Sequence, residues 1–306
     1  DRAGFRWTLF AAAAVVLALV AGGVWIYRVQ TEGVRAEVER ELSAIALLKA
    51  AQITDWYNDQ LADGTSLMRH PYLIDAIERF LAAPGGDNRR ELLRRWTFLA
   101  EQHGLSDIRL VDGQGRERLR LGPATEDHAP RLGPFVQRAL AERNPVFIDL
   151  HPDAGRMPHS TIVVPLHAAA GQGQRALGCL LLLSDASAFL FPQLQQWPIP
   201  SSTAETLLVR REGESALFLV NTRHRPDAAF TLREPLGQTE LVTVMAAQGR
   251  QGYVHGRDYR GAPVEAVVLP IPNTPWFLVA KIDTDEAFAV GRSRVLLLLG
   301  LLATLA

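Results

Sequence analysis

The sequence predicts an α+β protein in which one long N-terminal helix precedes two antiparallel sheets. Three observations support this fold class. Apolar residues recur at helical spacing through residues 29–69, apolar and polar residues alternate as in strands from residue 107 onward, and the order of a hairpin, a helix and three strands occurs twice. Because 48% of the 306 residues are hydrophobic, the chain has enough apolar material for two cores. Its formal net charge of −1 gives no reason to expect nucleic acid as a partner.

Residues 1–27 contain an apolar run, LFAAAAVVLALVAGGVWI, that is close to the length of a membrane-spanning helix. About 20 apolar residues cross a hydrocarbon core of about 30 Å, and this run carries no charge. Arg2 and Arg6 precede it and aromatic residues lie at both of its ends, as in a span with a cytoplasmic N-terminus. A cleaved signal peptide is the alternative, but no small-residue cleavage site follows the run. We therefore expect a transmembrane helix.

A second apolar run, VLLLLGLLATLA, fills most of residues 291–306 and follows Arg292 and Arg294. We expect it to be the first part of a second transmembrane helix, and the chain to be a piece of a longer membrane protein. With a cytoplasmic N-terminus, two spans would place residues 28–294 outside the cytoplasm.

Residues 28–70 predict a long stem helix. Apolar residues such as Val38, Leu42 and Ile45 recur every three to five positions, and no proline occurs before Pro71. About 40 residues would extend about 60 Å at 1.5 Å per residue, which is too far for a helix with nothing alongside it. We expect two copies of the chain to form a homodimer through this stem.

Two sheet modules are expected after the stem, a membrane-distal one at residues 71–197 and a membrane-proximal one at 198–290. The first begins with helices at 72–82 and 89–103 and continues with a hairpin that turns at residues 112–115, a short helix and three strands. A helical stretch and the proline-flanked WPIPSS lead to a second hairpin, the helical LVTVMAAQ and three strands that end in WFLVAKID.

The long helix after the first apolar run and two longer stretches carry a resemblance to a known family. SDASAFLFPQLQQWPIPSSTAETLLVRREGE at the junction of the modules and GRDYRGAPVEAVVLPIPNTPWFLVAKIDTDEAF before the second apolar run resemble double-Cache sensor domains of bacterial transmembrane receptors. The resemblance covers residues 28–294. It implies two PAS-like modules in the periplasm, an inner-membrane location and a small ligand in the distal module. It also implies a cytoplasmic output outside this sequence, such as a histidine kinase, a cyclic-di-GMP enzyme or a chemoreceptor signalling region.

The resemblance further implies that a ligand lies between the distal sheet and the loops above it. Asp149 occupies the place of a strand aspartate, and Asp185 ends the last strand, where such sensors often keep an acid for a ligand amine. The Arg-x-Trp-Tyr cluster of the amino-acid sensors is absent, because the corresponding region reads GPATEDHAPRLG. An α-amino acid is therefore not the expected ligand.

The other polar residues on the expected pocket side suit a carboxylate. A guanidinium binds a carboxylate through two parallel hydrogen bonds, and an imidazole adds a donor. Arg118 and Arg120 are two residues apart on a strand and share one face, with Leu119 on the other. A solvent-exposed strand face is the alternative, because arginine is frequent throughout the sequence. The predicted ligand residues are Arg109, Arg118, Arg120, Asp149, His151, His159, Ser160 and Asp185.

The cluster Asp258-Tyr259-Arg260-Gly261 could be a ligand grip or a reversal of the chain. Asp at the first position and Gly at the fourth are typical of a type I turn, in which Asp caps the backbone and Gly relieves the exit. We predict a turn between two strands, in which replacement of Tyr259 costs little stability.

Two functions of different class stay open on the sequence alone. One is a module that senses a small ligand, and the other is a ligand-free module that binds a periplasmic protein. No phosphate-binding loop, Gly-x-Ser-x-Gly elbow or His-Glu-x-x-His motif is present, so we expect no catalytic site in this segment. The spacing of His151, Asp153 and His159 matches no closed metal site, and no cofactor is expected.

Overall fold

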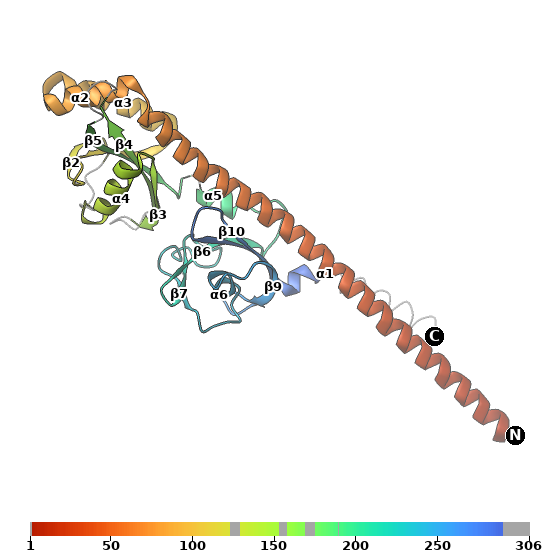
Figure 1. Ribbon diagram of the computed structural model, residues 1–306. Helices are drawn as coiled ribbons and strands as arrows, with labels where there is room; N and C mark the ends of the chain where they lie inside the picture. The colour runs from red at the N-terminus through yellow and green to blue at the C-terminus, as the bar shows by residue number, and fades with distance from the viewer. Residues whose placement is uncertain (1, 123–128, 153–157, 169–174, 189, 290–306) are drawn as a thin grey trace.

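The computed structural model describes residues 2–122, 129–152, 158–168, 175–188 and 190–289, with residues 2–31 and 129–131 described by their backbone alone. A single helix, α1 (Arg2–Met68), runs through the predicted first span and the predicted stem without a break. Two sheet modules lie along it, one after the other (Figure 1). The predicted α+β fold with a long N-terminal helix and two antiparallel sheets is confirmed.

The structure does not describe the side chains of either predicted membrane span. Within the described part of the chain, no helix combines the length and the apolar composition that crossing a membrane requires. The second predicted span, at residues 291–306, lies outside the described residues. The apolar run of the first span falls in the part of α1 that is described by its backbone alone.

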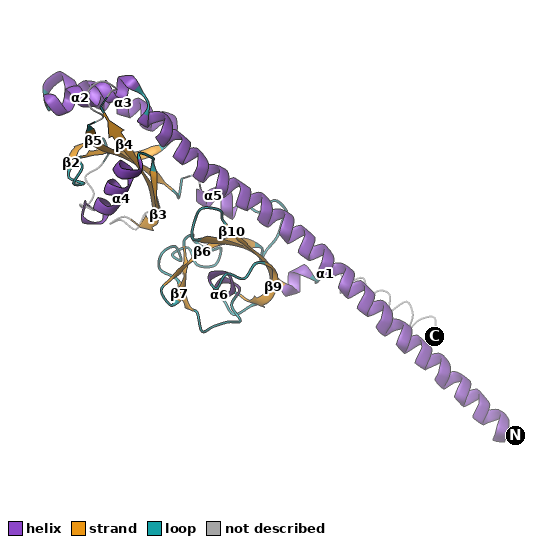
Figure 2. Cartoon of the chain, in the orientation of Figure 1, coloured by secondary structure: helices purple, strands orange, loops and turns teal. Residues whose placement is uncertain are grey.

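The distal module is the one farther from the N-terminal end of α1, and it begins with two helices that follow directly from it (Figures 1 and 2). α2 (Pro71–Ala82) starts with proline at its first position, where the missing N–H costs nothing, and α3 (Gly86–His103) ends at Gly104 in the left-handed conformation. The module also contains α4 (Ala129–Glu142) and α5 (Leu190–Gln195).

The distal sheet is antiparallel and has the strand order β2-β1-β5-β4-β3. Alternate residues of its strands pack on opposite faces, so the sheet has two cores. On the stem side, residues such as Ile162 and Leu182 pack against the helices α1, α2 and α3, and on the α4 side residues such as Val163 and Leu181 pack against α4. The strands are β1 (Leu105–Val111), β2 (Glu117–Arg120), β3 (Val146–Pro152), β4 (Pro158–His167) and β5 (Ala176–Asp185).

Gly64 explains how α1 comes so close to the distal sheet. A Cβ at this position would lie 3.0 Å from the side chain of Ile162 and 3.2 Å from that of Val164, which is tighter than ordinary van der Waals contact. Glycine costs an isolated helix about 1 kcal/mol relative to alanine, but here it permits direct packing of the helix on the strands.

The proximal module contains a six-stranded antiparallel sheet of order β8-β7-β6-β11-β10-β9. Five of these strands were predicted, and the short β8 was not, because its three residues follow an irregular stretch that has no alternating pattern. α6 (Val242–Ala247) covers one face of the sheet and α1 the other, and α7 (Thr284–Ala287) follows the last strand. The strands are β6 (Glu205–Glu212), β7 (Ser215–Phe218), β8 (Arg233–Pro235), β9 (Gly252–Arg257), β10 (Pro263–Pro270) and β11 (Trp276–Asp283).

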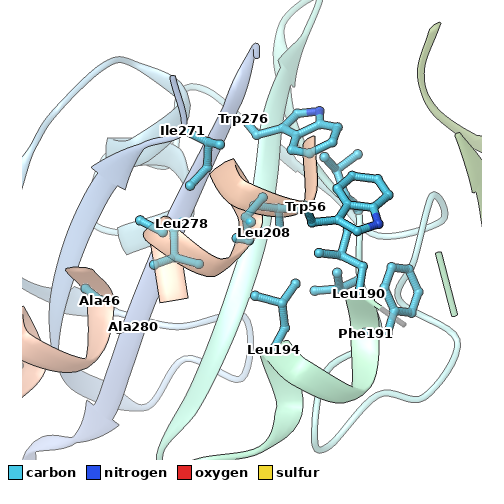
Figure 3. Packing of buried hydrophobic residues seen from close by; sticks show 14 of the residues in the cluster. Ala46, Trp56, Leu190, Phe191, Leu194, Leu208, Ile271, Trp276, Leu278 and Ala280 are labelled. Atoms are coloured by element: carbon cyan, nitrogen blue, oxygen red, sulfur yellow. The ribbon is translucent and has the colours of Figure 1, made fainter. Parts of the chain in front are cut away.

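An aromatic cluster joins the two modules to the stem. The ring of Trp56 on α1 stacks on that of Trp276 with centroids 6.5 Å apart, and Phe147 of the distal module meets both tryptophans edge-on. Leu190 and Leu194 of α5 extend the same core (Figure 3). Trp276 is therefore a core residue, and it belongs to a core that the two modules share.

The predicted turn at Asp258 is confirmed, but the contacts of Tyr259 argue against the expectation that its replacement costs little stability. The N–H of Gly261 donates to the carbonyl of Asp258 at 2.8 Å, and Gly261 has φ +80°, as the turn requires. Tyr259, however, donates its hydroxyl to Glu205 at 2.8 Å and packs edge-on against Phe218. Its removal would open a buried hydrogen-bonding site as well as a packing gap, so it contributes to stability.

A buried lysine explains why this turn is so heavily bonded. The ammonium of Lys281 lies 2.7 Å from the carboxylate of Asp258 and 2.8 Å from that of Glu205, and Lys281 and Asp258 are fully buried. The guanidinium of Arg260 also donates to Asp258, at 2.7 Å. Burial raises the pKa of Asp258, but the hydrogen bonds from Arg260 and Lys281 outweigh burial and lower it. The cluster holds β6, β11 and the turn together.

Candidate functional site

A cluster of three charged residues lies on the α4 side of the distal sheet. Asp107 and Arg109 are two residues apart on β1, and Arg120 is the direct partner of Arg109 on β2, so all three side chains project from the same face. The Nε of Arg109 donates to Asp107 at 2.5 Å, and the Nε of Arg120 lies 3.6 Å from the same carboxylate oxygen. Asp107 and Arg109 are 4% and 6% exposed, which is rare for charged residues. We call these three residues the charged cluster.

Gly122 closes the charged cluster on one side. Its backbone N–H donates to the carboxylate of Asp107 at 2.9 Å. A Cβ on Gly122 would lie 2.6 Å from that oxygen, a distance that real Cβ atoms do not show, so only glycine permits this contact. The backbone therefore helps to hold Asp107 in position beside the two guanidinium groups.

Two of the eight predicted ligand residues, Arg109 and Arg120, belong to the charged cluster. Arg118 projects from the same face of β2, as predicted, but its side chain is exposed, while Leu119 is buried on the stem side. His159 also lies on the α4 side, because it pairs directly with Asp185 on β5. His151 pairs with His159 from β3, and its Nδ1 lies 2.8 Å from the backbone carbonyl of Asp149.

Asp149 lies where the two modules meet. Its carboxylate accepts a hydrogen bond from the indole N–H of Trp276 at 2.6 Å and from the guanidinium of Arg210 at 2.7 Å. Both donors belong to the proximal module. In this structure the acid joins the modules, and it is not part of the charged cluster.

Ser160 lies on the stem side of the sheet, where it is the direct partner of Ser184. The hydroxyl of Ser184 donates to Gln60 of α1 at 3.0 Å. Asp185 ends β5 and accepts hydrogen bonds from the backbone and the hydroxyl of Ser187. The structure thus distributes the predicted residues over both faces of the sheet.

A cavity of about 610 Å³ lies between the stem and the end of β5. This volume is within the range of about 300–1,000 Å³ for small-molecule sites. Asp185 is the only one of the eight predicted residues on its wall. The lining residues of this stem cavity are Gln52, Asp55, Trp56, Asp59, Gln60, His103, Gly104, Ser184, Asp185, Ala188 and Gln193. Asp153, which the sequence places near His159, lies outside the described residues, and no group of three metal-ligating side chains occurs in the described ones.

Sequence reasoning missed Asp107 and Gly122. A usable signal for Asp107 was its spacing from Arg109, since residues two apart on a strand share a face, and the next residue on that face, Val111, is apolar and buried. Two opposite charges on the buried face of one strand predict an ion pair. No comparable signal exists for Gly122, because its contact with Asp107 depends on how the chain returns after β2.

Comparisons with known proteins agree with this fold. No family model and no curated protein matches the chain. Among solved structures, the extracellular domain of vpHK1S-Z8, a protein named as a histidine kinase, is 17% identical and has a TM-score of 0.56, with 84% of this chain and 94% of that chain covered. The ligand-binding domain of the Pseudomonas aeruginosa PAO1 chemoreceptor PctB, solved with L-Arg, is 15% identical at a TM-score of 0.54, with 83% and 98% covered. The ligand-binding domain of Mlp24, solved with asparagine, is 13% identical at 0.56, with 85% and 99% covered.

These neighbours share the chain's architecture over more than four-fifths of its length. The resemblance to double-Cache sensor domains is thereby confirmed at the level of the fold. At such low identity the likeness does not carry over a ligand or an output activity.

Proposed function

We propose that this chain is the extracytoplasmic sensing part of a bacterial transmembrane receptor, and that its distal module binds a small organic ligand. The observation that carries the proposal is the charged cluster in a fold shared with ligand-binding domains of receptors. Burying charged residues costs free energy, and proteins that do so often use them at functional sites.

The ligand that suits the charged cluster best carries a carboxylate. The guanidinium groups of Arg109 and Arg120 converge on one face, and the fork of N–H donors on a guanidinium matches a carboxylate. Part of each fork is already bound within the protein, by Asp107 for Arg109 and by Glu117 for Arg120. Asp107 orients both of them from the side, with the help of Gly122. The resemblance to sensor domains favours the distal module for this role over the proximal one.

Calorimetry of the purified chain against a panel of small organic acids and amino acids tests this proposal. Arg109→Ala should weaken binding by about 1.5–3 kcal/mol, the range for a hydrogen bond to a charged group. Arg118→Ala is the matched control, because this arginine is exposed on the same face, and it should leave binding within about 0.5 kcal/mol. Equal losses in both variants, or no binding to any member of the panel, would refute the assignment.

A protein partner is the second candidate function, and exposed aromatic residues favour it. Tyr72 on α2 is 72% exposed and Phe98 on α3 is 64% exposed, both at the end of the molecule that lies farthest along α1. Exposed aromatic side chains are enriched where proteins bind one another. If no small ligand binds and Tyr72→Ser abolishes capture of a periplasmic protein, this second function replaces the first.

The proposal includes a homodimer through the stem and a membrane anchor at the first apolar run. Ala44, Leu47, Leu48 and Ala51 are exposed on α1, with Leu47 at 61% and Leu48 at 51%. Their spacing of three, four and seven residues forms one apolar stripe, as in a short coiled-coil seam. Sedimentation of Leu47→Glu should show monomers, and Asn58→Glu, also exposed on α1, should not.

The receptor would signal by a shift between two populations. A ligand changes the equilibrium only by its preference for one arrangement of sheet and stem over the other, and a hundredfold preference corresponds to about 2.7 kcal/mol. A few charge-assisted hydrogen bonds are enough to supply a preference of this size. The output that reads the shift, such as a histidine kinase or a cyclic-di-GMP enzyme, would follow the second apolar run.

A further inference from the structure

The short connection between the two modules, residues 197–200, is held at both of its ends. It reads WPIP, and it joins α5 of the distal module to β6 of the proximal module. The residues just before it are bound to α1, and those just after it are bound to α7, the last helix of the described chain. We call residues 197–200 the strut.

Lys49 of α1 binds the N-terminal side of the strut. Its ammonium donates to the backbone carbonyls of Gln193 and Gln196, the latter at 2.6 Å. These carbonyls belong to the end of α5, where a helix has no internal donors to offer and a cation is favoured. Lys49 is only 5% exposed, and burial lowers its pKa. The contact fixes the end of α5 to the stem.

Glu286 of α7 binds the C-terminal side. Its carboxylate accepts hydrogen bonds from the hydroxyl of Ser201 at 2.8 Å, from the N–H and the hydroxyl of Ser202 at 3.0 Å, and from the N–H of Thr203 at 2.9 Å. The hydroxyl of Thr203 also donates to it. Burial raises the pKa of Glu286, but these hydrogen bonds outweigh burial and lower the pKa to about 2. The carboxylate is therefore charged across the physiological range.

The strut itself is stiff. Pro198 and Pro200 fix their own φ angles near −65°, and each disfavours the helical conformation in the residue before it. The backbone bends at residues 198 and 199, so the strut is a short, bent connection whose prolines restrict its conformation. Trp197 also packs against the core shared by the two modules. A stiff segment that is fixed at both ends transmits displacement instead of absorbing it.

We propose that the strut, with Lys49 and Glu286 as its two anchors, couples the stem helix and the distal module to the segment that leaves the proximal module. Through it, movement of α5 reaches α7 without passing through the proximal sheet. Glu286 reaches across 83 residues of sequence to Thr203, past all six strands of that sheet. The use of this coupling in signalling rests on the proposed sensing function. The coupling itself is a mechanical link within the chain and can be measured without a ligand.

Hydrogen exchange of the full chain at pH 7 tests the coupling without any ligand. The effect of Lys49→Met is measured twice, once in the chain that keeps Glu286 and once in a chain that also carries Glu286→Gln. Glu240→Gln is the control for the loss of a carboxylate, because Glu240 is an exposed glutamate of the same module. Glu286→Gln alone should speed exchange of the Ser202 and Thr203 amides by about tenfold, since they lose their charged acceptor.

The decisive result is the difference between the effect of Lys49→Met in the chain that keeps Glu286 and its effect in the Glu286→Gln chain. Lys49→Met should speed amide exchange in residues 284–288 by about fivefold when Glu286 is present, and by less than about twofold when it is replaced. Equal acceleration in both backgrounds, or none in either, would overturn the proposal. If Lys49→Met unfolds the chain, an insertion of two glycines between Pro198 and Ile199 replaces it in the same comparison, because the insertion makes the strut flexible. Failure of the chain to bind any small ligand would refute the sensing function and leave this result standing.

Discussion

Replacing Lys281 by methionine is the strongest test of the buried charges in the proximal module. Its ammonium lies within 2.8 Å of both Asp258 and Glu205 and is fully buried. At an effective dielectric constant near 20, each contact has a Coulomb energy of about 6 kcal/mol, much of which is offset by the desolvation of three charges. Removing one member of such a cluster typically costs about 3–5 kcal/mol, because the remaining charges stay buried.

We expect a value near the lower end of that range, about 3 kcal/mol, because each acid keeps other donors. Asp258 retains Arg260, and Glu205 retains the hydroxyl of Tyr259 and the backbone N–H of Arg223. Lys281 is one of the groups that lower the pKa of Asp258, so this pKa should rise in the variant. The loss of stability should then be full near neutral pH and should shrink at acid pH, as Asp258 takes up a proton.

Urea denaturation at several pH values measures both effects. Lys49→Met is the matched control, because Lys49 is the chain's other lysine, is also buried and binds only backbone carbonyls. Its replacement should cost about 1–3 kcal/mol, with no dependence on pH over the same range. If Lys281→Met costs less than about 1 kcal/mol, or if its cost is the same at neutral and at acid pH, the electrostatic account of this cluster is wrong.

Three further predictions follow from single contacts. Gly122→Ala should displace Asp107, costing about 1–3 kcal/mol of stability and weakening ligand binding at the charged cluster, and unchanged binding in calorimetry would contradict this. The pKa of Glu234 is raised to about 7 by burial, so stability should fall as the pH rises through 7, and Glu234→Gln should abolish that slope in thermal melts. Trp276→Phe removes the donor to Asp149, and it should cost about 1–3 kcal/mol and broaden the cooperative unfolding of the two modules, whereas a single unchanged transition would argue against the contact as a coupling point.

Most of the fold could be predicted from the sequence because it is determined by local patterns. The nearly continuous apolar runs in ALGCLLLLSD and in WFLVAKID indicate strands whose two faces are both covered, and the absence of proline before Pro71 permits a helix as long as α1. The turn at Asp258 was predictable for the same reason, since its signature lies within four residues. What lay beyond the sequence was the depth at which that turn is buried.

The candidate site was harder to predict because its contacts join distant residues. Asp149 and Trp276 are separated by 127 residues, and no local pattern indicates that the indole N–H will bind that carboxylate. Asp185 and Ser160 were grouped with the arginines because all of them are polar and lie on one sheet. Alternation along the strands assigns Ser160 to the opposite face from Arg109, and that assignment depends on knowing which residues pair.

The two faces of the distal sheet also explain how a ligand could affect the stem. Leu181 and Leu183 of β5 pack on the α4 side, and Leu182 between them packs on the stem side. Densely packed interiors transmit displacement, so a strand that shifts to accommodate a ligand beside the charged cluster also moves the residues that contact α1. The end of β5 leads into α5, which Lys49 fixes to the stem. A ligand that prefers one position of β5 by only about 2–3 kcal/mol would therefore bias the positions of both the stem and the strut. The C-terminal side of the strut is bound to Glu286, so this bias would extend to α7.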